Sequence, residues 1–261
     1  MSTVTSTTAR ELGTPRASRS WSDAVILVLA LLVLWQLCSW LAGPEILPTP
    51  WRTAVKALKI VRDEDFPQSL EATGIAFIAA LVISAIGGVS LGLVLGARRL
   101  AGDVMEPLLM AFYALPKITL YPVVLLMFGL GLSAKITFGV IHGIIPITVF
   151  TMGAVRNMPI VYARTALAYR LTPLDFARYV MLPAAIPEVV AGLRIGFSLT
   201  LLGTLIGEMF ASQSGIGHML MIAMARNDTE TIMALALMLF LFATGVNLLL
   251  LRWHHRLAKT G

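Results

Sequence analysis

The sequence predicts an all-α membrane protein. Of its 261 residues, 57% are hydrophobic and only 13% are charged, and the mean hydropathy is +0.84. A soluble domain averages about 25% charged residues. A helix needs about 20 apolar residues to cross a bilayer, and an open sheet cannot span lipid because its backbone groups stay unpaired. The long apolar stretches of this chain are therefore expected to be transmembrane helices.

Six stretches meet this length criterion. The first, second and sixth carry no charge, the third is interrupted only by Lys117, the fourth has His142 as its titratable group, and the interior of the fifth contains Arg194. The expected spans are residues 24–44, 72–97, 107–134, 136–155, 187–208 and 231–251.

The basic residues orient the chain. If the N-terminus is cytoplasmic, twelve Lys and Arg residues lie inside, and six, including Lys135, lie outside. The inner twelve fall in four segments, namely 1–20, 98–99, 156–178 and 252–259. The positive-inside rule thus predicts a multi-pass protein with both termini in the cytoplasm. The arginines are scattered and no aromatic platform accompanies them, so nucleic acid is not an expected partner.

The segments outside the spans have distinct compositions. Residues 1–20 are rich in Ser, Thr and Ala, which predicts a disordered cytoplasmic tail before a transmembrane domain over 21–261. Pro48 ends the first span, and Trp51 stands where an interfacial aromatic residue belongs. Residues 52–70 are expected to form an amphipathic helix on the outer surface.

Small residues recur at four-residue spacing in two spans. Such stripes let helices approach closely in lipid, where packing replaces the hydrophobic drive. We therefore expect a tight bundle. The stripe residues are Ser84, Gly88, Gly92 and Gly96 in the second span, and Gly192, Gly196, Gly203 and Gly207 in the fifth.

The chain lacks the residues of a catalytic or nucleotide site. No Gly-x-x-x-x-Gly-Lys-Ser/Thr loop is present, and no His, Asp or Glu cluster has metal-ligand spacing. Cys38 is the single cysteine, so no intrachain disulfide is possible. A membrane-embedded enzyme would need several reactive groups at one depth, whereas the spans offer isolated residues.

The segment between the fourth and fifth spans, residues 156–185, is expected to carry a short amphipathic helix. Thr172 suits the N-cap, Pro173 the first helical position, and Asp175 the third. Such a helix either docks in a partner groove or packs beneath its own bundle. The residues expected on its apolar face are Phe176, Tyr179 and Val180.

Fragments in the same order resemble the permeases of binding-protein-dependent ABC importers, in the nitrate, sulfonate and taurine subgroup. The resemblance covers most of residues 44–220. The fragments are Leu47-Pro48-Thr49-Pro50, GGVSLGLVLG at 87–96, Leu115-Pro116-Lys117, Tyr121-Pro122, Phe128-Gly129-Leu130-Gly131, Leu182-Pro183, Pro187, Gly192-Leu193-Arg194, Glu208 and Gly215-Ile216-Gly217.

The resemblance implies a fold and a set of partners. The fold would be the six-helix type I ABC importer (MetI-like) permease in a bacterial inner membrane. The chain would form a pore with a second copy or a related permease. Separate ATPase subunits would bind ATP and Mg, so this chain needs no cofactor, and an external binding protein would deliver a small anion. An energy-independent carrier remains the alternative, although no internal repeat supports it.

The family's loop signature, Glu-Ala-Ala and a later Gly, falls on Arg164-Thr165-Ala166 and Arg170. Both the glutamate and the glycine are replaced by arginine, which resists the left-handed turn that glycine permits. One hypothesis is that this chain is the divergent partner in an unequal permease pair. The residues implied in ATPase coupling are Arg164, Thr165, Ala166, Arg170, Phe176, Tyr179, Leu182 and Pro183.

Polar residues within the spans are candidates for a translocation path. Intramembrane charge is costly, so Lys117 either attracts an anionic substrate, snorkels toward the membrane surface or makes a structural pairing. Arg194 and Glu208 are expected to be architectural or gating groups. The path candidates are Lys117, His142, Ser198, Thr200 and Thr204.

Overall fold

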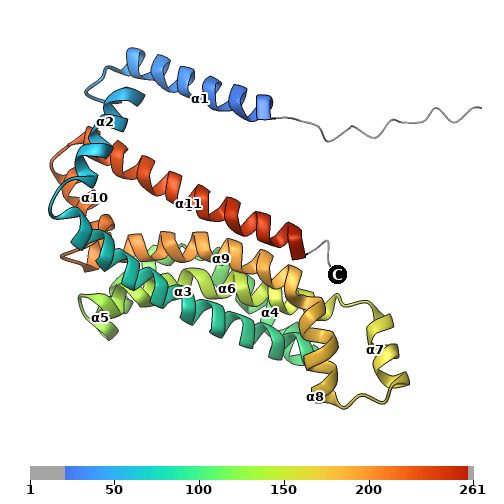
Figure 1. Ribbon diagram of the computed structural model, residues 1–261. Helices are drawn as coiled ribbons and strands as arrows, with labels where there is room; N and C mark the ends of the chain where they lie inside the picture. Colours follow the sequence, from blue (N-terminus) through green and yellow to red (C-terminus); the bar gives the residue numbers. More distant parts are fainter. Residues whose placement is uncertain (1–20, 258–261) are drawn as a thin grey trace, which may run out of the picture. The chain divides into compact units, whose positions relative to one another are not determined.

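The computed structural model describes residues 21–257. This part of the chain contains helices and connecting turns, and no strand (Figure 1). The tail expected over 1–20 lies outside the described residues. The chain divides into two units, residues 1–50 and 51–261, and each is described by itself.

The first unit consists of α1 (Trp21–Ala42) and the turn that follows it. The apolar side chains of α1 are mostly exposed, as expected for a helix surrounded by lipid. Gly43 ends the helix with a φ of +89°. The turn then folds back, because the Trp35 Nε1–H donates to the Pro48 carbonyl (3.1 Å) and the Ser39 hydroxyl donates to the Leu47 carbonyl (2.7 Å).

The second unit contains the remaining helices. Their bounds in chain order are α2 (Pro50–Val61), α3 (Phe66–Ala97), α4 (Arg99–Ala114), the 3-10 helix η1 (Lys117–Leu120), α5 (Tyr121–Phe128), α6 (Leu132–Arg156), α7 (Ile160–Ala168), α8 (Pro173–Phe176), the π-helix η2 (Ala177–Met181), α9 (Leu182–Ala211), α10 (Ile216–Ala225) and α11 (Thr229–Leu257).

The glycine stripe of α3 packs directly against α6. A β-carbon built on Gly92 would lie 2.5 Å from the Thr151 β-carbon and 2.7 Å from the Thr148 carbonyl oxygen. Gly88 and Gly96 make similar approaches to α6, one turn to either side. The expected close packing at this stripe is confirmed, since any side chain there would push the helices apart.

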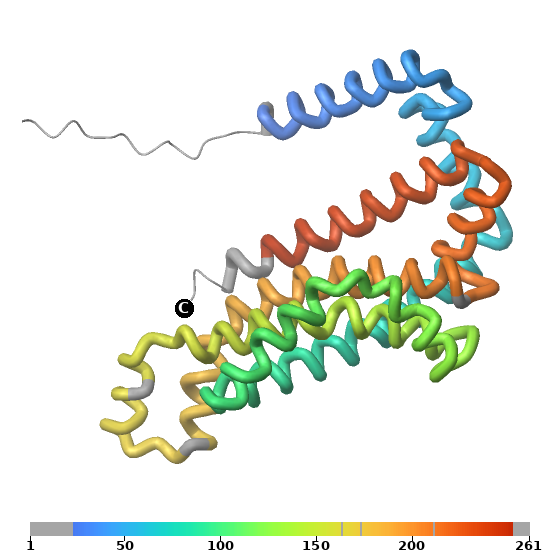
Figure 2. Tube along the Cα trace, turned by 180° about the vertical axis from the view of Figure 1, so that it is seen from behind, coloured from blue at the N-terminus to red at the C-terminus, as the bar shows by residue number. Residues whose placement is uncertain are grey.

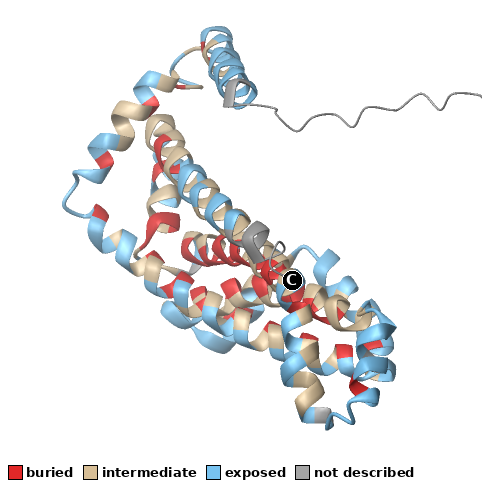
Figure 3. Cartoon of the chain, turned by 45° about the vertical axis from the view of Figure 1, so that its right-hand side comes forward, coloured by how far each residue is buried: buried red, intermediate tan, exposed pale blue. Residues whose placement is uncertain are grey.

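The glycines of α9 pack on another side of α6. Gly192 approaches Phe150, and Gly207 approaches the backbone of Lys135. Helix α6 therefore lies between α3 and α9 (Figure 2). It is the most buried of the candidate spans: 56% of the residues in its most apolar stretch are buried, compared with 11% for α11. The buried residues of the second unit concentrate along these three helices (Figure 3).

The third expected span, 107–134, does not form one helix. Helix α4 ends at Ala114, and η1 with α5 continues at 90° to it. Leu115 precedes Pro116 and is extended, with φ −64° and ψ 138°, because the proline ring disfavours a helical conformation at the preceding residue. Gly129 and Gly131, both with positive φ, then separate α5 from α6.

Two other span boundaries also differ from those expected. Helix α6 begins at Leu132, so Lys135 belongs to its first turn and not to a connecting loop. Helix α9 covers 182–211 and continues from α8 and η2 without a break. Among the described residues, five helices are long and apolar enough to cross a membrane, or six if the bent α4–α5 pair is one span.

Helices α2, α10 and α11 meet around a small apolar core. Its buried members include Ile60, Phe66, Ile216 and Leu235. Asp228 begins α11 as its N-cap, because its carboxylate accepts hydrogen bonds from the backbone N–H (3.0 Å) and the hydroxyl (2.6 Å) of Thr231. The Lys56 ammonium of α2 lies 3.5 Å from the same carboxylate.

Replacing Asp228 by alanine is expected to lower stability by about 1 kcal/mol at neutral pH, which is typical for loss of an N-cap. Partial burial acts to raise the pKa of Asp228, but the hydrogen bonds from Thr231 and the charge of Lys56 hold that pKa below its ordinary value of 3.8. The carboxylate therefore stabilises the fold fully above pH 3.8, and this contribution is lost as the pH falls through the lower folded pKa.

Thermal unfolding of the wild type and D228A across acidic pH checks this prediction. The difference between the two proteins should shrink as the pH falls below 3.8. If the stability difference between the wild type and D228A stays constant until Asp228 is fully protonated, the charge of Asp228 does not contribute to stability.

Candidate functional site

Helices α7 and α8 with their connecting turn, and the π-helix η2 that follows, span residues 160–181. They form a segment that extends past the ends of α3, α6 and α9 (Figures 1 and 2). We call it the α7–α8 segment. Helix α7 ends in a Schellman turn, in which the Leu171 N–H donates to the Ala166 carbonyl (2.9 Å). Arg170 has a φ of +52°. It therefore occupies the left-handed position, although arginine was expected to resist it.

Replacing Arg170 by glycine is expected to stabilise this turn by about 1 kcal/mol, because glycine avoids the steric cost of a left-handed conformation. Amide exchange at Leu171 should slow about fivefold. Asn227 has the same φ of +52° and a matching turn, in which Asp228 N–H donates to the Ala223 carbonyl (2.9 Å).

Asparagine tolerates this conformation better than arginine, so N227G is the matched control and should slow exchange less. Faster exchange at Leu171 in R170G would contradict the prediction.

The start of α8 agrees with the sequence expectation. The Asp175 N–H donates to the Thr172 hydroxyl oxygen (3.2 Å), and that hydroxyl donates to the Asp175 carboxylate (2.6 Å). Thr172 is thus confirmed as the N-cap. The following π-helix, however, turns by i→i+5 hydrogen bonds. As a result Phe176 and Val180 are half-buried, while Tyr179 is 65% exposed, so the three do not share one buried face.

The α7–α8 segment leaves large apolar side chains exposed. Leu167, Tyr169 and Leu174 are 76–78% exposed. Phe176 instead lines an open cavity of about 810 Å³ against the ends of α3, α4 and α6. Arg156 closes one side of this cavity and is held by the carboxylates of Asp103 and Glu106, the latter at 2.6 Å.

The other residues expected in coupling lie around this segment. Ala166 is buried and its carbonyl accepts the turn hydrogen bond. The remaining ones are exposed: Arg164, Thr165, Leu182 and Pro183.

Lys117 is engaged by its own neighbourhood. It lies in η1, at the bend of the broken span, where its ammonium donates to the Tyr113 carbonyl (3.1 Å) and lies 4.9 Å from the centre of the Tyr113 ring. These contacts correspond to the structural alternative considered for this lysine.

Three of the other path candidates meet at the contact between α6 and α9. His142 is buried, with Nδ1 2.8 Å from the Phe138 carbonyl, so Nδ1 carries the proton. Thr204 is fully buried and donates to the Thr200 carbonyl (3.0 Å). Thr200 is also fully buried, and its hydroxyl has no hydrogen-bond partner among the residues that the structure describes. Ser198 is half-buried and lies apart from them, 3.5 Å from the Arg194 carbonyl.

A buried polar cluster joins α3, α6, α9 and α10 at the other end of the bundle. At its centre is the carboxylate of Glu208, which is 0% exposed. It accepts hydrogen bonds from the Thr73 hydroxyl (2.8 Å) and the Gly217 N–H (2.9 Å). The Thr73 oxygen also accepts from the Ile216 N–H (2.8 Å). The start of α10 is thus folded around one carboxylate, and a side chain at Gly215 would collide with it.

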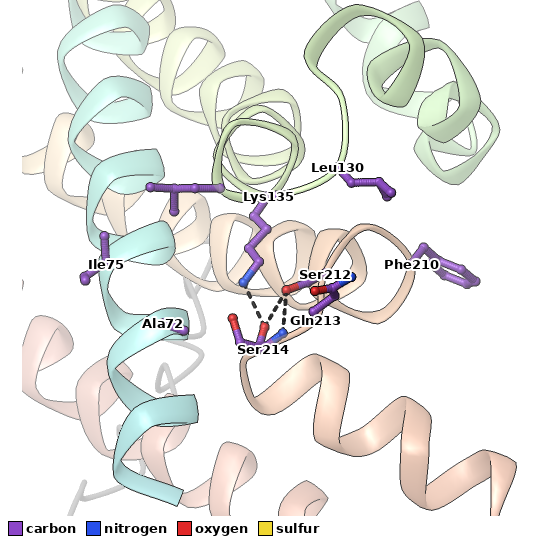
Figure 4. A pocket seen from close by; sticks show the side chains of 10 residues that line it. Ala72, Ile75, Leu130, Lys135, Phe210, Ser212, Gln213 and Ser214 are labelled. Carbon is purple, nitrogen blue, oxygen red and sulfur yellow. Dashed lines mark hydrogen bonds between the residues drawn. The ribbon is translucent and has the colours of Figure 1, made fainter. Parts of the chain in front are cut away.

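Lys135 compensates the charge of Glu208. It is 4% exposed, and its ammonium lies 3.5 Å from the Glu208 carboxylate. It also donates to the Ser214 carbonyl (2.8 Å), beside an open cavity of about 560 Å³ (Figure 4). Burying two charges is costly unless they are paired and hydrogen-bonded. The Oε2 atom of Glu208 accepts both hydrogen bonds, whereas Oε1 has no hydrogen-bond partner among the described residues and is compensated by the Lys135 charge alone.

The sequence predicts an architectural or gating role for Glu208 but does not reveal its partner, because Lys135 is counted there among the outer charges. The sequence does contain a signal for this pairing, because a single lysine stands between two apolar stretches. A lysine at such a position is buried if the link between the stretches is buried, and it then needs a carboxylate partner. In addition, the described residues contain no group of three or more His, Cys, Asp or Glu side chains that could hold a metal.

The fold and these sites define the class of protein: a multi-pass helical membrane protein with a segment that projects past three of its long helices. A family model for the binding-protein-dependent transport system inner membrane component matches residues 88–260. This chain belongs to that family. It is therefore the permease of a binding-protein-dependent ABC transporter in the inner membrane, a transport subunit rather than an enzyme or a cofactor-binding chain.

Curated relatives cover most of the chain. A probable ABC transporter permease protein of Haemophilus influenzae is 30% identical over 217 residues, covering 82% of this chain and 88% of the relative. The taurine transport system permease protein TauC of Escherichia coli is 25% identical over 241 residues (87% and 88%). The riboflavin transport system permease protein RibX of Chloroflexus aurantiacus is 29% identical over 237 residues (87% and 88%).

Proposed function

We propose that this chain is the pore subunit of an ATP-driven importer and that its α7–α8 segment is cytoplasmic and docks on the ATPase. The observation that carries the proposal is the exposure of Leu167, Tyr169 and Leu174 on a segment that projects past the long helices. Apolar side chains on such a projection gain by entering a partner groove. Both termini are then cytoplasmic, and α10 faces the external binding protein.

The test is capture of the tagged chain from its native membrane in mild detergent, followed by identification of the bound proteins. Y169D and Y179D are expected to remove the ATPase, because each places a charge in the docking surface. Both residues are exposed, so the fold should survive. L100D is the matched control, since Leu100 is 80% exposed and lies outside the segment, in the first turn of α4.

Failure to recover an ATPase with the wild type would contradict the proposal and favour an energy-independent carrier. The same capture tests the pairing of permeases, because a second permease sequence among the bound proteins would identify an unequal pair. A single permease species would favour a pair of identical chains.

We further propose that the substrate is a small anion. Relatives named for taurine, aliphatic sulfonates and nitrate support it. Relatives named for riboflavin and formylaminopyrimidine favour a heterocyclic nutrient as the second candidate. Uptake of taurine, nitrate and riboflavin is measured in cells with and without this gene, each in the presence of the others as competitors. Only members of the true substrate class should show uptake that depends on the gene and should compete with one another.

A further inference from the structure

The exposed charge of the α7–α8 segment is almost entirely positive. Between residues 157 and 187 the charged residues are Arg164, Arg170, Arg178 and Asp175. Asp175 is half-buried and engaged by the Thr172 hydroxyl at the start of α8. The three arginines are exposed. The segment therefore presents a net positive surface.

These arginines have no carboxylate partner within the described part of the chain, because none lies within ion-pair distance. Arg178 lies only near the ring of Tyr179, with its guanidinium carbon 5.7 Å from the ring centre. The neighbouring Arg156 behaves differently, since Asp103 and Glu106 neutralise it within the chain.

Two of these arginines lie close along the chain to the exposed apolar residues. Arg164 lies one turn before Leu167, and Arg170 follows Tyr169 directly. A partner that covers Leu167 and Tyr169 must also cover or border these guanidinium groups. Covering a charge without pairing it is costly, so the partner has to supply carboxylates.

We infer that the ATPase partner carries an acidic docking groove, with carboxylates facing Arg164 and Arg170, and that this charge match selects the partner. This inference rests on the proposed function. The other acidic surface available to basic residues is an anionic lipid headgroup. The projection of the segment past the ends of α3, α6 and α9 favours a protein partner (Figures 1 and 2).

The test measures binding of the purified ATPase to the detergent-solubilised full chain at low and high salt. Wild-type affinity should fall as salt rises, because exposed charge pairs are screened. R164E and R170E should each weaken binding about tenfold, since each reversal replaces attraction by repulsion. R98E is the matched control, because Arg98 is exposed but lies outside the segment, and its binding should not change.

R170G separates charge from folding. The glycine should tighten the turn after α7 yet weaken ATPase binding, because it removes one charge. A merely structural role for Arg170 would move both measurements in the same direction. Reversing a groove carboxylate of the ATPase to arginine should in turn restore binding to R164E.

Three outcomes would overturn the inference. If the affinity for the ATPase changes neither with salt nor in R164E and R170E, the inference is wrong but the proposed function stands. Unchanged ATPase binding, with loss of binding to vesicles containing one quarter phosphatidylglycerol, would assign the arginines to lipid. Failure of the wild type to bind any ATPase would remove the proposed function as well.

Discussion

Replacing Lys135 by methionine is expected to destabilise the protein by about 3–5 kcal/mol, because it leaves the fully buried Glu208 carboxylate without its counter-charge. The Lys135 ammonium lies 3.5 Å from that carboxylate, and both side chains are at least 95% buried. Loss of the lysine also leaves the Ser214 carbonyl without its donor. Thermal unfolding of the detergent-solubilised protein measures the effect.

The chain contains a matched control for this experiment. Lys56 also lies 3.5 Å from a carboxylate, that of Asp228, but their side chains are 29% and 39% exposed. K56M should therefore cost less than about 1 kcal/mol, as exposed ion pairs do. The same separation with a different burial isolates the effect of the surroundings.

A double substitution tests whether the two groups act as a pair. Glutamine at position 208 keeps an acceptor for Thr73 and Gly217 but removes the negative charge. The loss of stability in K135M/E208Q should therefore be smaller than the sum of the losses measured for K135M and E208Q separately. Additive effects, or equal losses for K135M and K56M, would show that the buried charge pair is not what stabilises this end of the bundle.

Replacing Gly92 by alanine is expected to cost about 1–3 kcal/mol, because the new β-carbon would lie 2.5 Å from the β-carbon of Thr151. The neighbouring contact is the Thr148 carbonyl oxygen at 2.7 Å, which belongs to the helix backbone and cannot rotate away. Helices α3 and α6 would have to separate. A lower unfolding temperature and a lower yield in the membrane are the expected readouts.

Gly74 is the control for this substitution, since it lies in the same helix and a β-carbon there would meet nothing within 4 Å. G74A should be neutral or stabilising by up to about 1 kcal/mol, as alanine is the better helix former. If G92A and G74A behave alike, helix propensity rather than packing governs the stripe.

Features set by neighbouring residues were predictable from the sequence. The Thr172 cap, the close approach at Gly92 and the family membership follow from local spacing or order along the chain. The shared face of Phe176 and Tyr179 was wrong for a local reason that spacing does not reveal, namely the π-turn that follows α8.

Features that depend on register between distant helices were not predictable. Lys135 and Glu208 are 73 positions apart, and they meet because Gly207 brings α9 against the backbone of Lys135. Hydropathy placed the lysine in a loop because its charge interrupts the apolar stretch. The 90° bend of the third span is similar, since Pro116 marks a break but does not specify its angle.

The position of α6 between two glycine-lined neighbours has a mechanical consequence. Helices whose backbones touch resist sliding or rotating past each other, so we expect α3, α6 and α9 to move together as one block. Any alternation between two pore states then falls to the bent α4–α5 pair and to α11, which pack less closely. Spectroscopic labels within the block should keep one distance through the ATP cycle, while labels from the block to α5 should report the moving part.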